Sequence, residues 1–220
     1  MHPEPKIREG IALQRRGDFE AAASIYTEML DRDPEHVQAL HYLGLVRYQQ
    51  DRLEEAAHLL TDSLQRDPRN PNAWSDLGMV RVRADAPEEA LEPISRALAL
   101  APEHPDALNN MGQALSKLGR FEQARPLLER LVILKPNSAG AHYALANVQK
   151  RANDISAAIA TYQKGIRLDP NDRRIRLGLG DTYESAGRFK QAKMQYLAVL
   201  RRDSDSPLAL AKLLQLPCRE

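Results

Sequence analysis

The sequence predicts an all-α protein of about thirteen helices, stacked as antiparallel pairs, and three recurrences on one 34-residue step predict it. Prolines follow this step at Pro34, Pro68, Pro102, Pro136 and Pro170. Alanines follow it at Ala22, Ala56, Ala90, Ala124, Ala158 and Ala192. Glycines follow it at Gly10, Gly44, Gly78, Gly112 and Gly180, with Ala146 in the remaining position. A fixed period of this length marks a repeat protein, in which one supersecondary unit is copied and stacked.

The first helix of each unit is predicted from helical spacing of apolar residues. In the second repeat, Leu40, Leu43 and Val46 follow that spacing until Asp51 breaks it. The recurring glycine lies in the middle of this helix, where it costs about 1 kcal/mol relative to alanine. Its recurrence therefore indicates that a second helix approaches closely at that point.

The second helix begins after a short polar break, which favours an antiparallel neighbour. In the second repeat, its apolar stripe holds Ala56, Leu60 and Leu64. The proline at the end of the unit stops this helix. Proline lacks an amide hydrogen and disfavours helix in the residue before it.

These residues resemble the tetratricopeptide repeat (TPR) family, whose pattern appears here as Leu43-Gly44, Ala56, Leu60 and Pro68, with Trp74 opening the third unit. The resemblance implies a right-handed superhelical solenoid. It divides residues 1–206 into six tandem 34-residue units, followed by a C-terminal capping helix and tail at 207–220. The units are 3–36, 37–70, 71–104, 105–138, 139–172 and 173–206. Ala146, Gly165 and Ser204 depart from the family pattern.

The tail is predicted to form the thirteenth helix, because Pro207 suits a first helical turn. One face of this helix can cover the sixth repeat. The other leucines would stay exposed unless a second copy of the chain or a following domain meets them. The sequence therefore allows either self-association through 207–216 or a short frayed cap. The leucines are Leu208, Leu210, Leu213, Leu214 and Leu216.

Composition excludes several classes of protein. The 220 residues carry a formal net charge of +1, without the basic excess expected of a nucleic-acid binder. No apolar run approaches the ~18 residues of a membrane span. The first residues hold no apolar signal core, so a cytoplasmic location is expected unless a signal has been removed. The single Cys218 cannot form an internal disulfide.

The sequence offers no motif for catalysis. It has no glycine-rich phosphate loop, no metal-ligand spacing and no nucleophile motif. His36 and His104 occupy the same repeat position, which favours a structural role. We therefore expect no enzyme activity, no cofactor and no metal site.

By the family resemblance, the first helices line a concave groove that usually binds peptides or another protein. Amide side chains suit an extended peptide, since each can donate to and accept from its backbone. We expect Asn110 and Asn147 to lie on this exposed face. The alternative is that these are ordinary solvated helix residues. The predicted partner-binding residues are Tyr42, Leu45, Asp76, Met79, Asn110, Gln113, Tyr143 and Asn147.

A basic edge is predicted beside the groove, at Arg15, Arg83, Lys117 and Arg151. It could attract an acidic partner. Alternatively, these cations complement the dipoles of the first helices at their C-terminal ends.

The leading hypothesis for function is therefore a protein–protein interaction scaffold that holds a peptide or partner protein in the groove. The alternative is a non-catalytic targeting region of a larger bacterial glycosyltransferase or sulfotransferase-like enzyme. Segments such as residues 39–44 and 107–112 look like repeats that precede such domains. An open reading frame continuing into a catalytic domain would favour the alternative.

Overall fold

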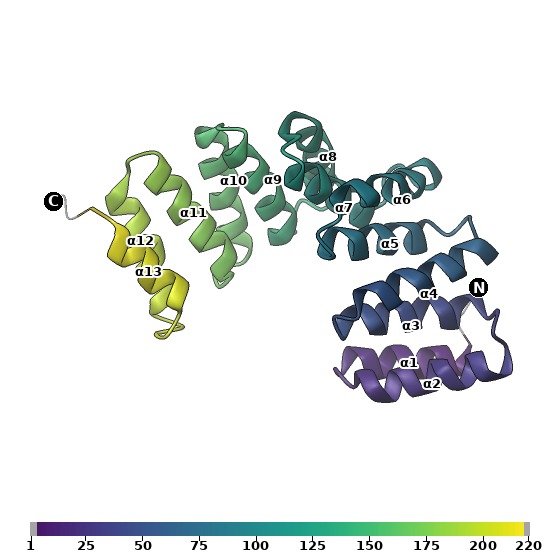
Figure 1. The fold of residues 1–220 in the computed structure, drawn as a ribbon. Coiled ribbons are helices and arrows are strands. Elements are labelled where there is room, and N and C mark those ends of the chain that lie inside the picture. The colour runs from purple at the N-terminus through teal and green to yellow at the C-terminus, as the bar shows by residue number, and fades with distance from the viewer. Residues whose placement is uncertain (1–3, 218–220) are drawn as a thin grey trace. The chain divides into compact units, whose positions relative to one another are not determined.

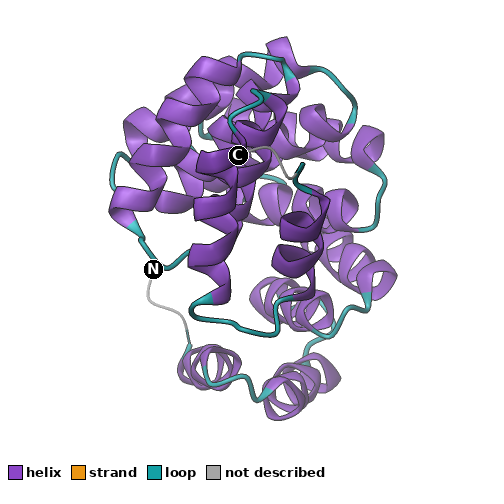
Figure 2. Cartoon of the chain, turned by 90° about the vertical axis from the view of Figure 1, so that its left-hand side faces the viewer, coloured by secondary structure: helices purple, strands orange, loops and turns teal. Residues whose placement is uncertain are grey.

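The computed structural model describes residues 4–217, which form thirteen α-helices and no strand (Figure 1, Figure 2). The all-α fold class predicted from the 34-residue step is confirmed. The helices are α1 (Pro5–Arg15), α2 (Phe19–Arg32), α3 (Val37–Gln49), α4 (Leu53–Arg66), α5 (Pro71–Arg83), α6 (Pro87–Leu100), α7 (Pro105–Lys117), α8 (Phe121–Leu134), α9 (Ala139–Arg151), α10 (Ile155–Leu168), α11 (Arg173–Ser185), α12 (Phe189–Leu200) and α13 (Pro207–Gln215).

The chain divides into two compact units, each larger than a 34-residue repeat. We call Met1–Leu118 the first unit and Gly119–Glu220 the second unit. In the first unit, α1 packs on α2, α3 on α4 and α5 on α6. In the second unit, α9 packs on α10, α11 on α12, and α13 on α12. The division falls between α7 and α8, inside the fourth of the six predicted repeats.

The turn between the two helices of each pair has one residue with a positive φ angle. This residue is Asp51 in the second repeat, at φ 63°, and Asn153 in the fifth, also at φ 63°. Glycine adopts this left-handed conformation without strain, and Asp and Asn tolerate it better than other residues. The repeat therefore restricts this position to small or short polar side chains: Gly17, Asp51, Asp85, Gly119, Asn153 and Gly187.

The second helices end where the prolines predict. In α2, α4, α6, α8 and α10 the last helical residue lies two positions before the proline of the repeat. The following first helix then begins at a side chain that accepts a hydrogen bond from a backbone N–H group, which compensates one of the unpaired donors at a helix start. His36 and His104 act in this way through Nδ1, so their structural role is confirmed. The side-chain caps are His36, Asn70, His104, Ser138 and Asp172.

The mid-helix glycines make room for a side chain of the second helix. A Cβ atom on Gly10 would lie 2.5 Å from the ring of Tyr26. A Cβ atom on Gly78 would lie 2.2 Å from Cγ1 of Ile94. Tyr26 and Ile94 are completely buried, so the close approach predicted from the glycines is confirmed.

Helix α13 starts in the register of a seventh first helix. Ala209 is buried, and Leu213 packs against the core of the second unit. The position that is glycine or alanine in all six repeats holds Leu214, which is 84% exposed. A second helix could not approach α13 there as it does in the other repeats. Self-association through 207–216 stays a prediction, and Cys218 lies outside the described residues.

Candidate functional site

The first helices form one layer within each unit. In the first unit, α1 contacts α3, α3 contacts α5, and α5 contacts α7 (Figure 1). In the second unit, α9 contacts α11. The second helices of consecutive repeats, as far as the chain is described, do not make comparable contacts with one another. The first-helix layer is therefore the more tightly spaced side of each unit, which we call the first-helix face.

Hydrogen bonds join neighbouring first helices of the first unit at a regular offset of 35 residues. Nε2 of His41 lies 2.7 Å from the Asp76 carboxylate. One repeat later, the Asn110 side-chain amide donates to the backbone carbonyl and to Oγ of Ser75, both at 3.2 Å. These two pairs occupy identical repeat positions, so α3, α5 and α7 are held in register by side-chain hydrogen bonds.

This arrangement corrects the expectation that Asn110 is exposed for recognition. Its side chain is buried, with 7% of the residue exposed. The sequence pattern could not separate the two roles, because an amide on the groove side of a helix suits a neighbouring helix as well as a peptide.

Substituting Asn110 with alanine should lower the free energy of unfolding by about 1–2 kcal/mol, because a buried residue loses both hydrogen bonds to Ser75. Gln113 is the matched control, since it is an exposed amide on the same helix. Gln113→Ala should change stability by less than about 0.5 kcal/mol. Urea unfolding followed by circular dichroism measures both values. Equal values for the two variants would contradict the structural role of Asn110.

A second set of side chains on α3, α5 and α7 keeps part of its surface exposed. Tyr42 is half-buried and stacks on the His41 ring, with centroids 5.4 Å apart and planes 18° apart. Leu45 and Met79 are half-buried, and Gln113 is exposed; these three share one repeat position. Together they give the first unit an apolar and aromatic surface with an amide at one end.

In the second unit, the predicted residues Tyr143 and Asn147 also make internal contacts. Asn147 accepts a hydrogen bond from the Tyr162 hydroxyl at 2.6 Å. Tyr143 packs tilted against the Tyr162 ring, with centroids 6.3 Å apart, and the Arg174 guanidinium lies over the Tyr143 ring, 5.4 Å from its centroid. Both residues remain half-buried, so each has some surface available to a partner.

The basic edge makes contacts with the preceding repeat. Lys117 forms an ion pair of 2.8 Å with Asp85; its hydrogen bond first, and then its charge, lower the pKa of that exposed carboxyl group. Arg83 pairs with Asp51 at 3.0 Å. Both carboxylates belong to the positive-φ turn position, a pairing at a 32-residue offset that sequence inspection missed.

The other two members of the basic edge, Arg151 and Arg15, have different surroundings. The Arg151 guanidinium lies 4.8 Å from the centre of the Phe121 ring. Arg15 is exposed at the end of α1. The edge therefore includes cations that are already paired, which leaves less charge for an acidic partner than the sequence suggests.

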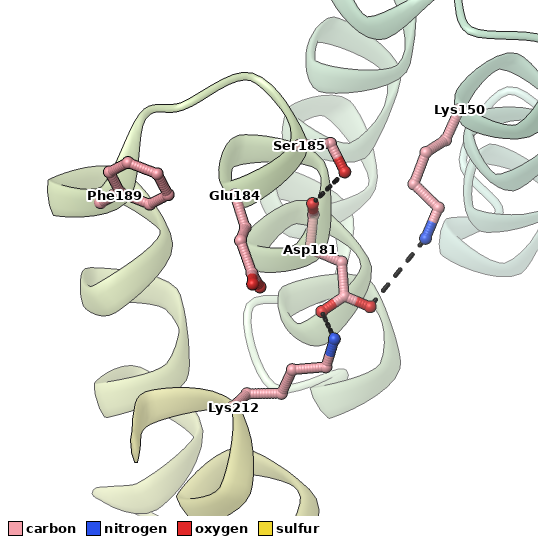
Figure 3. A pocket seen from close by; sticks show the side chains of 6 residues that line it. All are labelled: Lys150, Asp181, Glu184, Ser185, Phe189 and Lys212. Atoms are coloured by element: carbon pink, nitrogen blue, oxygen red, sulfur yellow. Dashed lines mark hydrogen bonds and ion pairs between the residues drawn. The ribbon is translucent and has the colours of Figure 1, made fainter. Parts of the chain in front are cut away.

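An open pocket of about 500 Å³ lies in the first-helix layer of the second unit (Figure 3). Asp181 lines the pocket and pairs with two other lining residues, Lys212 at 3.0 Å and Lys150 at 4.0 Å. The Tyr196 hydroxyl lies 2.9 Å from Asp181 and 3.0 Å from Glu184. Burial first, and then these two carboxylates, raise the pKa of Tyr196, so its hydroxyl stays a proton donor. The remaining lining residues are Ser185 and Phe189.

In residues 4–217, no three His, Cys, Asp or Glu side chains gather closely enough to hold a metal ion. No described helix combines the length and the apolar character needed to cross a bilayer.

Comparison with known proteins gives the same repeat architecture. A model described as the cilia and flagella-associated protein 70 C-terminal domain matches residues 7–173. A tetratricopeptide repeat model matches residues 143–207. No curated protein sequence matches this chain significantly.

Several solved structures share the fold at low sequence identity. The Cut9–Hcn1 hetero-tetramer of APC/C is 16% identical with a TM-score of 0.86, and the match covers 96% of this chain but only 42% of that chain. PilW, described as a widely conserved type IV pilus biogenesis factor, is 19% identical with a TM-score of 0.87; coverage is 94% of this chain and 96% of that one. YrrB, described as a TPR protein with an unusual peptide-binding site, is 22% identical with a TM-score of 0.65; coverage is 86% and 97%.

Proposed function

The chain belongs to the tetratricopeptide repeat family, and we propose that it is a non-enzymatic scaffold that holds a peptide or a partner protein on its first-helix face. One observation carries the proposal. In the first unit, the groove-side residues divide into a hydrogen-bonded framework and a second set of partly exposed side chains, Tyr42, Leu45, Met79 and Gln113.

The hydrogen-bonded framework supports recognition because it reduces the conformational entropy that is lost on binding. Side chains that are ordered before binding lose less conformational entropy when a partner arrives. Tyr42 is held by its stack on His41, and His41 is held by Asp76. An aromatic ring fixed in this way is typical of the residues that dominate interface energies.

The peptide-binding description of YrrB supports the same class of function. Within the second unit, the proposed contact surface includes Tyr143, Asn147 and the pocket around Asp181. The location in the cytoplasm and the role as a targeting region of a larger enzyme both stay predictions.

The proposal is tested with a partner captured by the tagged chain and then prepared in pure form. Tyr42→Ala should weaken binding of that partner by about 1–2 kcal/mol, roughly tenfold in Kd. Gln65→Ala is the matched control, because Gln65 is exposed on the second helix α4. Isothermal titration calorimetry measures both. Unchanged affinity in Tyr42→Ala, Met79→Ala and Gln113→Ala would rule out the first-helix face of the first unit.

A further inference from the structure

Although the whole chain has a formal net charge of +1, its two units carry large charges of opposite sign. Residues 1–118 hold 13 Lys and Arg against 20 Asp and Glu, a formal charge of −7. Residues 119–220 hold 18 Lys and Arg against 10 Asp and Glu, a formal charge of +8. A chain that is balanced as a whole is therefore acidic in one unit and basic in the other.

The acidic charge of the first unit is concentrated on its second helices. Helices α2, α4 and α6 each carry three carboxylates and one arginine. Glu20, Glu54 and Glu88 occupy the same repeat position in the first helical turn, and all three are exposed. Five of the nine carboxylates on these helices already form ion pairs with Lys or Arg: Glu28, Glu54, Glu55, Glu89 and Glu92. The three helices still carry nine carboxylates against three arginines, so a surplus of negative charge remains.

Two of the three second helices of the second unit, α10 and α12, reverse this pattern. The third, α8, is balanced, with Glu122 and Glu129 beside Arg125 and Arg130. Helices α10 and α12 contain no Asp or Glu. They present Lys164, Arg167, Lys190 and Lys193, all exposed. Within the described part of the chain, no ion pair joins these four cations to a carboxylate. Lys190 stands at the repeat position that holds Glu20, Glu54 and Glu88 in the first unit.

We propose that the basic face of α10 and α12 docks on the acidic face of α2, α4 and α6 of a second copy of the chain. The argument for this occupant is the complementarity within one sequence, because formal charges of −7 and +8 nearly cancel when the two units meet. Complementary fields steer association and fix which faces meet.

This contact is heterologous, since the two copies contribute different faces to it. Such contacts join molecules head to tail and produce either a closed ring or an open filament. It uses the outer faces of the second helices, so it goes beyond the proposed function and leaves the first-helix face of every copy free to hold a partner.

Sedimentation velocity over a concentration series tests the contact. At about 50 mM salt, the weight-average mass should exceed the 24.7 kDa of one chain and rise with concentration. At about 500 mM salt it should return to that of one chain, because salt shortens the range of interactions between exposed charges. A chain that stays monomeric at every concentration in low salt would overturn the proposal. So would association that survives high salt and is lost in Leu210→Glu with Leu214→Glu, which would assign it to α13.

A complementation experiment tests the head-to-tail geometry. One variant removes the basic face with Lys164→Gln, Arg167→Gln, Lys190→Gln and Lys193→Gln. The other removes acidic charge with Glu20→Gln, Glu54→Gln and Glu88→Gln. All seven residues are exposed, and circular dichroism checks that both variants are folded. Each variant alone should be monomeric, and an equimolar mixture should form a 1:1 dimer that grows no further. Two folded variants that remain monomeric when mixed would contradict the pairing of these faces, whatever the result for the first-helix face.

Discussion

Tyr162→Ala should lower the free energy of unfolding by about 3–5 kcal/mol, the usual cost of truncating a large buried aromatic side chain. Tyr162 is completely buried in the core of the second unit. Its ring packs against Gly178, where a Cβ atom would lie 2.8 Å from the ring. Its hydroxyl also donates to Asn147 at 2.6 Å. The alanine variant would therefore lose ring packing and a hydrogen bond together.

Tyr162→Phe separates these two contributions. It keeps the ring and removes the hydroxyl, so it should cost only about 0.5–1.5 kcal/mol. Chemical unfolding monitored by circular dichroism measures both variants, with the exposed Met194→Ala as a control near zero. If Tyr162→Ala cost no more than Tyr162→Phe, the ring would not be the anchor of this core.

Two glycine-to-alanine substitutions should change stability in opposite directions, with a difference of about 3 kcal/mol. In Gly78→Ala the new Cβ atom would meet Ile94 at 2.2 Å, and this overpacking should cost about 2 kcal/mol after the gain in helix propensity. Gly140 is also helical, but a Cβ atom there meets only Oγ of Ser138, at 3.8 Å. Gly140→Ala should therefore stabilise the chain by about 0.4–1 kcal/mol.

Thermal unfolding of the two glycine variants and the parent chain measures this difference. The comparison separates helix propensity from packing, because both substitutions are chemically identical and both positions lie in helices. A stabilised Gly78→Ala variant would show that α5 and α6 do not approach each other closely at this point.

Most of the fold could be predicted from the sequence because each repeated residue has one local physical role. The prolines mark the ends of second helices, and the turn position admits only residues that tolerate a positive φ. Such restrictions act within a few residues of chain and are visible in any single repeat.

Less of the candidate site could be predicted, because the role of each side chain there depends on its contacts with the neighbouring repeat. The family resemblance predicted Asn110 on an exposed face, but the residue is buried, and its hydrogen bonds to Ser75 depend on an offset of 35 residues. The pairing of Lys117 with Asp85 depends on an offset of 32. Both offsets are close to the repeat length, and a search for matching residues at 34 does not reveal them.

The buried tyrosines offered a sequence pattern that could have been found. Where the second helix holds Tyr162 or Tyr196, the first helix of the same repeat holds Asn147 or Asp181 to accept its hydroxyl hydrogen. A buried tyrosine hydroxyl needs such a partner. The polar residues Asn147 and Asp181 are thus partly explained by packing, before any partner is considered.

Site-specific photo-cross-linking tests the central claim, that a partner is held on the first-helix face, most directly. A photoreactive amino acid placed at Leu45 or Gln113 samples that face, and the same group at Gln65 or Ser95 samples exposed positions on the second helices α4 and α6. Cross-links from Leu45 and Gln113 to the purified partner, absent from Gln65 and Ser95, are the predicted result. Cross-links from Gln65 and Ser95 alone would contradict the claim and assign partner binding to the outer faces of the second helices.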